Sequence, residues 1–305
     1  MSKIADKIYK NAKIYSVALD GAETHAEALA IKDGKFVYVG NNEGAKAWIG
    51  DSTEIIDCNG KSIIPGLGDA HMHLVNAAKK YGSCNFGDIV PNPETDTPEN
   101  VLKQMQEKLK IYADENKDTP VIRGIGWDRT WFSGGMQGIK MPLTRQAIDA
   151  VIPDKPAVLM SYCGHRLMLN TKALEVAGVT KDTDDLNGLI VMGADGNPSG
   201  YIKEPVAYIP IIAKIKGYEF TQEEHHKFLK KTFKYYNELG ILCCATAFKQ
   251  LNRMTHFWKW RRTENLPPEF QAFIISTTRQ EKLTLKRQLP TVQNLTLMDY
   301  LLLTR

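Results

Sequence analysis

The chain has 305 residues, 43% of them hydrophobic and 24% charged, a composition typical of a globular protein with ample material for a buried core. Its five scattered cysteines have no CxxC spacing, which argues against a disulfide framework or a thiolate zinc site. Because no apolar run approaches the roughly 20 residues that span a bilayer, and the N-terminal segment is charged rather than signal-like, we expect a cytoplasmic protein.

The formal net charge of +4 is unevenly distributed along the chain. Residues 1–240 carry 29 basic and 31 acidic side chains, whereas residues 241–305 carry 10 basic and 4 acidic ones. All 23 glycines lie at or before Gly240, and arginine outnumbers lysine only after it. Charge, glycine content and arginine usage therefore change together, which predicts a boundary near Gly240.

The N-terminal part of the chain predicts antiparallel strands. Asp33 and Gly34 lie between two apolar runs, a pattern typical of a β-hairpin. Asn59 and Gly60 lie between a second pair of short apolar runs and predict another strand pair. We therefore expect residues 1–64 to form a small β domain.

Beyond this domain, helical patterns alternate with short apolar runs. Thr97 is a candidate N-cap, Pro98 would be the first helical residue, and apolar residues follow at helical spacing. A second helix begins with a capping box of Thr221 and Glu224 and ends at Gly240. The run ILCCATAF then predicts a strand, and this order predicts βα units around a parallel sheet.

His71 and His73 end the short strand-like segment PGLGDAHMHL. Because alternate residues of a strand point to one face, the two imidazoles are expected on the same side. Imidazoles in this arrangement can bind zinc, nickel or iron, but two histidines satisfied by hydrogen bonds inside a core give the same pattern. The motif alone leaves both interpretations open.

The context of this motif resembles the amidohydrolase superfamily. A small β domain followed by Pro-Gly-Leu and then Asp-Ala-His-Met-His resembles the end of that superfamily's first barrel strand. Three further segments resemble the amidohydrolase 3, or YtcJ-like, branch in the same order: GIGWDRTWF, MPLTRQAIDAVIPDKPAVLMSYCGHRLMLNTKALEVAGV and NGLIVMGADGNPSGYIKE. The resemblance covers roughly residues 5–242, with one departure at Gly68, where the branch usually has a bulkier apolar residue.

This resemblance implies an α/β fold, a partial TIM (β/α)8 barrel of the metal-dependent hydrolase type with a small N-terminal β-sandwich-like domain. Residues 1–64 would be the N-terminal half of a composite β-sandwich, and residues 65–242 the first part of the barrel with an insertion. The implied activity is metal-dependent hydrolysis of a non-peptide C–N bond in an amide, formamide or cyclic amide. The implied cofactor is a divalent metal ion, zinc by preference. The implied partner is a small-molecule substrate, without nucleic acid or membrane, and a homo-oligomer stays open.

Carried over residue by residue, the resemblance makes His71 and His73 metal ligands. Glu204 is a candidate third ligand, in the place of a carboxylated lysine elsewhere in the superfamily, and Lys203 is the less favoured alternative. A solvated Lys-Glu pair explains these two residues equally well. Asp69 would orient a ligating histidine or, alternatively, cap the end of the strand.

Four residues are carried over as substrate contacts. His165 and Asn170 lie in the Gly-His…Asn segment of the branch, and Trp127 and Asp128 lie in GIGWD. A structural, hydrogen-bonded histidine and a packed indole are the alternatives for His165 and Trp127.

Residues 243–305 resemble nothing in the family. The superfamily site needs two later histidines and a late aspartate that shuttles protons, yet after Gly240 the chain has only His256 and Asp299, in unrelated surroundings. We therefore expect a shifted reading frame near Leu242, an aberrant tail beyond it, and no identified catalytic residue. The alternative function is a truncated, catalytically incomplete fragment with residual metal or ligand binding.

Overall fold

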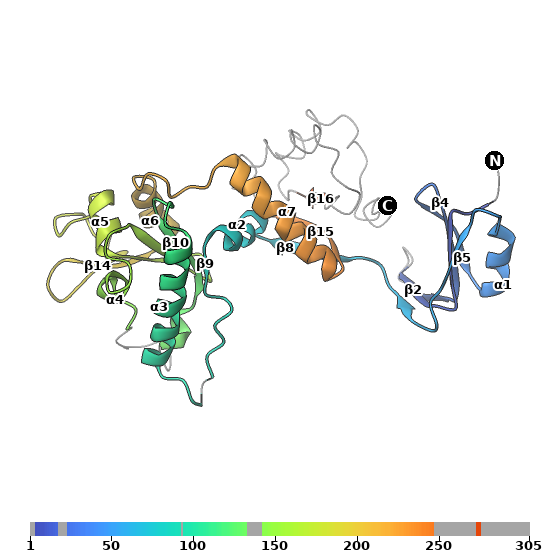
Figure 1. Ribbon diagram of the computed structural model, residues 1–305, viewed down its shortest axis with the longest axis horizontal. Helices are drawn as coiled ribbons and strands as arrows, with labels where there is room; N and C mark the ends of the chain where they lie inside the picture. The colour runs from blue at the N-terminus through green and yellow to red at the C-terminus, as the bar shows by residue number, and fades with distance from the viewer. Residues whose placement is uncertain (1–3, 18–22, 93, 133–141, 247–272, 276–305) are drawn as a thin grey trace. The chain divides into compact units, whose positions relative to one another are not determined.

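The computed structural model describes residues 4–17, 23–92, 94–132, 142–246 and 273–275. The chain divides into two compact units, of which unit 1 comprises residues 1–73 and 232–305 and unit 2 comprises residues 74–231. Unit 2 is therefore inserted into the sequence of unit 1, and Figure 1 shows the elements of each. Within the described residues, no helix is both long and apolar enough to cross a membrane. The predicted tail lies outside the described residues, apart from 243–246 and 273–275.

Two small sheets form the N-terminal part of unit 1, with strand orders β5-β4-β1-β6 and β3-β2-β7. Their strands are β1 Lys7–Lys10, β2 Lys13–Val17, β3 Glu23–Ala26, β4 Ala28–Lys32, β5 Lys35–Gly40, β6 Glu54–Asp57 and β7 Ser62–Ile63. The short helix α1, Asn42–Ala45, packs on the first sheet through Ala45, which is buried with Ile8 and Ala30.

The hairpin predicted at Asp33 and Gly34 is confirmed. Both residues have positive φ, 47° and 71°, as a two-residue turn between twisted antiparallel strands requires, and β4 pairs antiparallel with β5. The strand pair predicted around Asn59 and Gly60 is wrong, because β6 pairs in parallel with β1 while β7 pairs in parallel with β2. The Gly60 N–H donates to the Asn11 carbonyl at 2.7 Å, so this turn lies beside the β1–β2 connection and passes from one sheet to the other.

A third sheet of unit 1 has the order β16-β15-β8 and is parallel. Its strands are β8 Leu67–Met72, β15 Ile241–Thr246 and β16 Phe273–Ile275. The strand predicted after Gly240 is thus confirmed as β15. Residue 246 pairs with Met72, so the carboxyl ends of β8 and β15 lie side by side although all of unit 2 separates them in sequence.

Unit 2 is built on a six-stranded sheet of order β13-β14-β12-β11-β10-β9. Its strands are β9 Cys84–Asn85, β10 Ile122–Trp127, β11 Ala157–Ser161, β12 Arg166–Leu169, β13 Ile190–Met192 and β14 Pro198–Lys203. The predicted parallel pairing holds for β9, β10 and β11, whereas β12, β13 and β14 pair antiparallel. The difference arises because a tight turn ending at Gly164, with φ of 73°, reverses the chain between β11 and β12 without a helix.

Helices cover both faces of this sheet. Successive residues of β11 enter different cores: Leu159 packs in a core with α3 and α4, and Val158 packs in another with α5 and α6. These helices are α3 Pro98–Glu115, α4 Arg145–Asp149, α5 Thr171–Ala177 and α6 Pro205–Ile212. Between β8 and β9 lie the short α2, Leu74–Ala78, and the 3-10 helix η2, Lys79–Gly82.

Both predicted helix starts are confirmed. Thr97 Oγ1 accepts the Asn100 N–H at 3.2 Å at the start of α3. Helix α7, Gln222–Glu238, has a capping box in which the Glu224 N–H donates to Thr221 Oγ1 at 3.2 Å and the Thr221 N–H donates to the Glu224 carboxylate at 2.7 Å.

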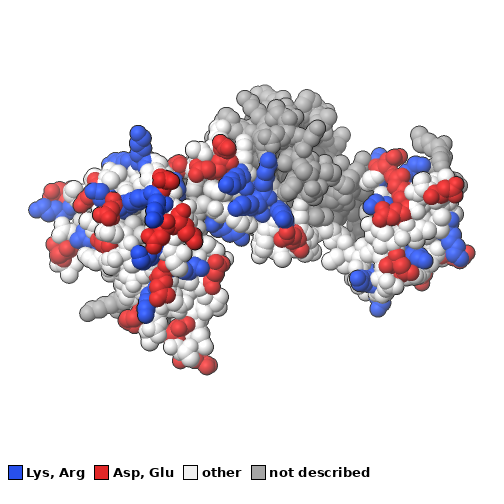
Figure 2. All heavy atoms as spheres, viewed as in Figure 1, with Lys and Arg blue, Asp and Glu red and all other residues white. Residues whose placement is uncertain are grey.

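Helix α7 is amphipathic. Its buried side includes Phe228, Leu229 and Phe233. Its exposed side carries Lys227, Lys230, Lys231 and Lys234, and basic side chains gather over this helix in Figure 2. This division is the one expected of a helix that packs against the protein with one face and meets water with the other.

Candidate functional site

His71 and His73 lie at the carboxyl end of β8, as the sequence predicts. Both side chains are exposed, and their ring centroids are 5.6 Å apart with the ring planes at 87°. The exposure excludes the alternative of two histidines satisfied inside a core. Imidazole is a common metal ligand, but a protein zinc site uses three or four protein ligands, of which these two residues would supply two.

Asp69 acts on the backbone of this segment. Its Oδ1 accepts the main-chain N–H of His71 at 2.9 Å, which agrees with the strand-end cap and not with an orienting contact to an imidazole. Within the described residues, no three histidine, cysteine, aspartate or glutamate side chains form a group that could hold a metal ion. The role of His71 and His73 as metal ligands therefore stays a prediction.

Glu204 and His165 form a direct pair in unit 2. The antiparallel register of β12 and β14 places Arg166 opposite Lys203. His165, one residue before Arg166, therefore lies opposite Glu204, one residue after Lys203. The Glu204 N–H donates to the His165 carbonyl at 2.7 Å, and His165 Nδ1 lies 2.8 Å from Glu204 Oε2. The structure thus brings the predicted third ligand against a predicted substrate contact, in place of a solvated Lys-Glu pair.

The backbone of Glu204 is strained. Its ψ of 140° is the usual one before a proline, here Pro205, but its φ of 62° is unfavourable for a residue with a side chain. Such a conformation costs roughly 1–3 kcal/mol. The contact with His165 is about half exposed on both sides, and even charged pairs in such exposed positions contribute only about 0–1 kcal/mol. The pair therefore does not offset the strain.

Asn170 is not a substrate contact, which corrects the sequence prediction. It is fully buried, and its Oδ1 accepts the N–H groups of Ala157 at 2.8 Å and Ala173 at 2.9 Å. Its Nδ2 donates to the carbonyls of Ile152 and Lys155, both at 2.9 Å. All the hydrogen-bond donors and acceptors of this amide are used to cap α5 and to join that helix to β11, so none is left to bind a ligand.

Trp127 also belongs to the core, as its alternative interpretation held. It is fully buried, and its indole Nε1 donates to the Leu159 carbonyl at 3.0 Å. Asp128 is partly exposed, and its Oδ1 accepts the N–H of Thr130 at 2.8 Å and its hydroxyl at 2.9 Å. Asp128 therefore caps the 3-10 helix η3, Arg129–Phe132. Of the four predicted substrate contacts, His165 has the most exposed side chain.

Cys163 has a thiol with a lowered pKa, which the sequence did not predict. Its Sγ accepts a hydrogen bond from Arg166 Nη1 at 3.1 Å and lies 3.3 Å from Ser161 Oγ. Partial burial acts to raise the pKa of this thiol, but hydrogen bonds from Ser161 and the His165 N–H, together with Arg166, hold the pKa below its usual value. The only sequence signal was its position in the turn YCGH.

We expect Cys163 to react with iodoacetamide well before Cys84. Cys163 is exposed with a lowered pKa, whereas Cys84 is 3% exposed and its burial raises the pKa to about 12. Because the thiolate is the reacting species, Cys163 is modified first in native protein at pH 8. Peptide mass spectrometry after timed quenching measures both rates. Equal rates in the folded protein would contradict this ordering.

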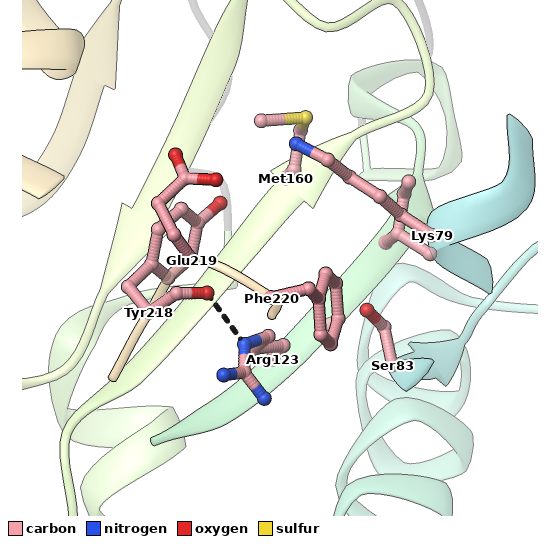
Figure 3. Close-up of a pocket in the computed structure, with 9 residues that line it drawn as sticks. Lys79, Ser83, Arg123, Met160, Tyr218, Glu219 and Phe220 are labelled. Carbon is pink, nitrogen blue, oxygen red and sulfur yellow. Dashed lines mark hydrogen bonds between the residues drawn. The ribbon is translucent and has the colours of Figure 1, made fainter. Parts of the chain in front are cut away.

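Arg123 supports a loop beside a small pocket of unit 2 (Figure 3). The guanidinium is 8% exposed, donates from Nε to the Tyr218 carbonyl at 2.7 Å, and stacks 4.3 Å from the centre of the Phe220 ring. Burial lowers its pKa. The pocket is about 20 Å³, room for about one water, so it is too small for an amide substrate.

The family model described as "Amidohydrolase family" matches residues 54–295, more than half of the chain. The chain belongs to the amidohydrolase family. The predicted resemblance is thereby confirmed, and the matched range of this amidohydrolase also runs beyond Leu242 into the segment predicted to be unlike the family.

Two curated relatives of this amidohydrolase are longer than the chain. Exoenzymes regulatory protein AepA of Pectobacterium carotovorum is 30% identical over 241 residues, which are 78% of this chain and 48% of AepA. N-substituted formamide deformylase of Arthrobacter pascens is 26% identical over 211 residues, which are 68% of this chain and 36% of that protein. The chain thus spans less than half the length of these relatives.

A solved structure supports the fold. A metal-dependent hydrolase from Pyrococcus horikoshii OT3 aligns with a TM-score of 0.57 and 22% identity, over 92% of this chain and 50% of that chain. The predicted fold class, an α/β fold of the metal-dependent hydrolase, TIM-barrel type with an N-terminal sheet region, is confirmed.

Proposed function

We propose that this amidohydrolase hydrolyses a non-peptide carbon–nitrogen bond with the help of a divalent metal ion, zinc by preference. The observation that carries the proposal is the pair of exposed imidazoles, His71 and His73, on one side of the carboxyl end of β8. These two residues would hold the metal. When bound, the ion would lower the pKa of a water molecule and polarise the scissile carbonyl.

The substrate we propose is a small amide, formamide or cyclic amide. Family membership supports a hydrolase of this kind, and one relative is by its name a deformylase of N-substituted formamides. The assignment of Glu204 as a third ligand stays a prediction, and its contact in the structure is with His165.

The domain organisation that we propose follows the sequence prediction. Residues 1–64 would be half of a composite β-sandwich, and residues 65–242 the first part of the barrel with its insertion. The pairing of β8 with β15 around unit 2 supports unit 2 as that insertion. The aberrant tail over 243–305 stays a prediction, which resequencing of the gene tests directly.

Metal analysis and a hydrolysis panel on the purified 305-residue chain test the proposed function. We expect about one equivalent of zinc, and amine release from N-substituted formamides that a chelator abolishes and added zinc restores. Bound zinc without turnover of any amide, formamide or cyclic amide would contradict the enzyme and support the incomplete fragment. A chain without bound metal would contradict the metal-dependent hydrolase.

A further inference from the structure

The HxH motif and the strand that carries it support an inference about a partner of this chain. We propose that one zinc ion joins two copies of the chain, and that each copy supplies both His71 and His73. The inference rests on the proposed function in taking these two residues as metal ligands. With four imidazole ligands the ion has no position left for water, so the joined state holds zinc without hydrolysing an amide.

The number of ligands is the first argument. His71 and His73 are both exposed, and within the described residues no third histidine, cysteine, aspartate or glutamate side chain completes a metal-binding group with them. Structural zinc sites are almost always tetrahedral, with four protein ligands. A second copy related by a twofold axis presents the same two residues and so supplies the two ligands that one copy lacks.

The spacing of the two rings suits one shared ion. Zn–N bonds of about 2.0–2.1 Å put the centre of each imidazole roughly 3.2 Å from the ion, so two rings at the tetrahedral angle lie roughly 5.2 Å apart. The observed separation of the ring centres is 5.6 Å, which is close to this value. The two rings are therefore spaced as joint binding to one ion requires.

Strand β8 is open to a second copy. Within the part of the chain that the structure describes, it is an end strand of its sheet, with β15 on one side and no strand on the other. Leu67, at its start, is 49% exposed, and the two histidines at its end are exposed as well. An exposed end strand is a ready surface for the approach of another chain.

The spacing of the motif brings four imidazoles together when two copies of β8 meet antiparallel about a twofold axis at Met72. His71 then lies opposite His73 of the second copy, and the reverse, so all four rings share one face of the two strands. Side chains directly opposite each other have Cβ atoms about 4.5–5.5 Å apart, which lets one ion reach every ring.

The ion, and not strand pairing alone, is expected to hold the two copies. Asp69 Oδ1 accepts the His71 N–H at 2.9 Å, so this donor is already used and is not offered to a second strand. Four neutral imidazoles gain a common partner only when zinc is present. We therefore expect the metal-free chain to be a monomer.

Sedimentation velocity of the full 305-residue chain, with zinc as the added metal, tests the inference. The chelator-treated chain should sediment as a monomer, and half an equivalent of zinc should double its mass. The isolated dimer should contain one zinc per two chains. Excess zinc supplies an ion to each chain, so monomers with about one zinc each should return. A dimer without metal, a monomer at half an equivalent, or a dimer with one zinc per chain would overturn the proposal.

Variants locate the shared ion. His71→Asn/His73→Asn should stay monomeric at every zinc concentration, whereas His25→Asn, which replaces an exposed histidine of β3, should dimerise as the native chain does. Each single variant at His71 or His73 should need at least about tenfold more zinc for the same fraction of dimer. Circular dichroism of the metal-free variants checks their fold. Zinc-dependent dimers of the double variant would place the ion elsewhere and refute the proposal.

Failure of this inference and failure of the proposed function give different results. Monomers at half an equivalent of zinc that release amine from an amide would overturn the shared ion and leave the hydrolase standing. A zinc-bridged dimer of a chain that hydrolyses no amide at any zinc concentration would support the shared ion and contradict the hydrolase.

Discussion

Replacing Asn170 with alanine is expected to lower the free energy of unfolding by about 3–5 kcal/mol. The fully buried amide satisfies two main-chain N–H groups and two carbonyls, which the variant leaves unpaired away from water. Each buried group without a partner costs about 1–3 kcal/mol, partly relieved by local rearrangement, and the N-cap of α5 is lost as well. Urea denaturation followed by circular dichroism measures the change.

A matched control is the exposed N-cap Asn41. Its side chain accepts the Gly44 N–H at 2.8 Å at the start of α1, a contact that water can replace. Asn41→Ala should therefore cost at most about 1 kcal/mol. If the two variants lose the same free energy of unfolding, the buried hydrogen bonds of Asn170 stabilise the protein no more than an exposed N-cap does.

Replacing both His71 and His73 with asparagine is expected to weaken zinc binding at least about 100-fold. Loss of an outer partner of a metal ligand already costs about 10- to 100-fold, and this variant removes the two proposed direct ligands. Competition with a chromophoric chelator measures the affinity. Because both side chains are exposed, the melting temperature of the metal-free variant should stay close to that of the native metal-free chain.

The control for this variant is His25→Asn, an exposed histidine of β3 that packs edge-on against Tyr15. It should bind zinc with native affinity. If the double variant retains native affinity, the metal is held elsewhere and the proposed site at β8 is wrong. If His25→Asn loses affinity as well, the effect is not specific to the HxH motif.

Features set by residues close in sequence were predictable. Thr97 and Thr221 cap helices through atoms three residues away, and the Asp33-Gly34 turn closes on its own flanking strands. The same logic failed at Asn59 and Gly60. The turn itself was predicted correctly, but the strands on its two sides pair with β1 and β2 and not with each other. Because β1 and β2 are distant in sequence, no local pattern indicates this pairing.

Some features of the candidate site were predictable from the sequence, and others were not. The sequence by itself determined the family, the HxH spacing and therefore the common side of His71 and His73, because a strand has a period of two whatever surrounds it. Only the tertiary structure decided that Asn170 is buried and that Glu204 meets His165. Burial and strand register depend on which segments pack together, and residues 165 and 204 meet because β12 and β14 pair in one register and not in another.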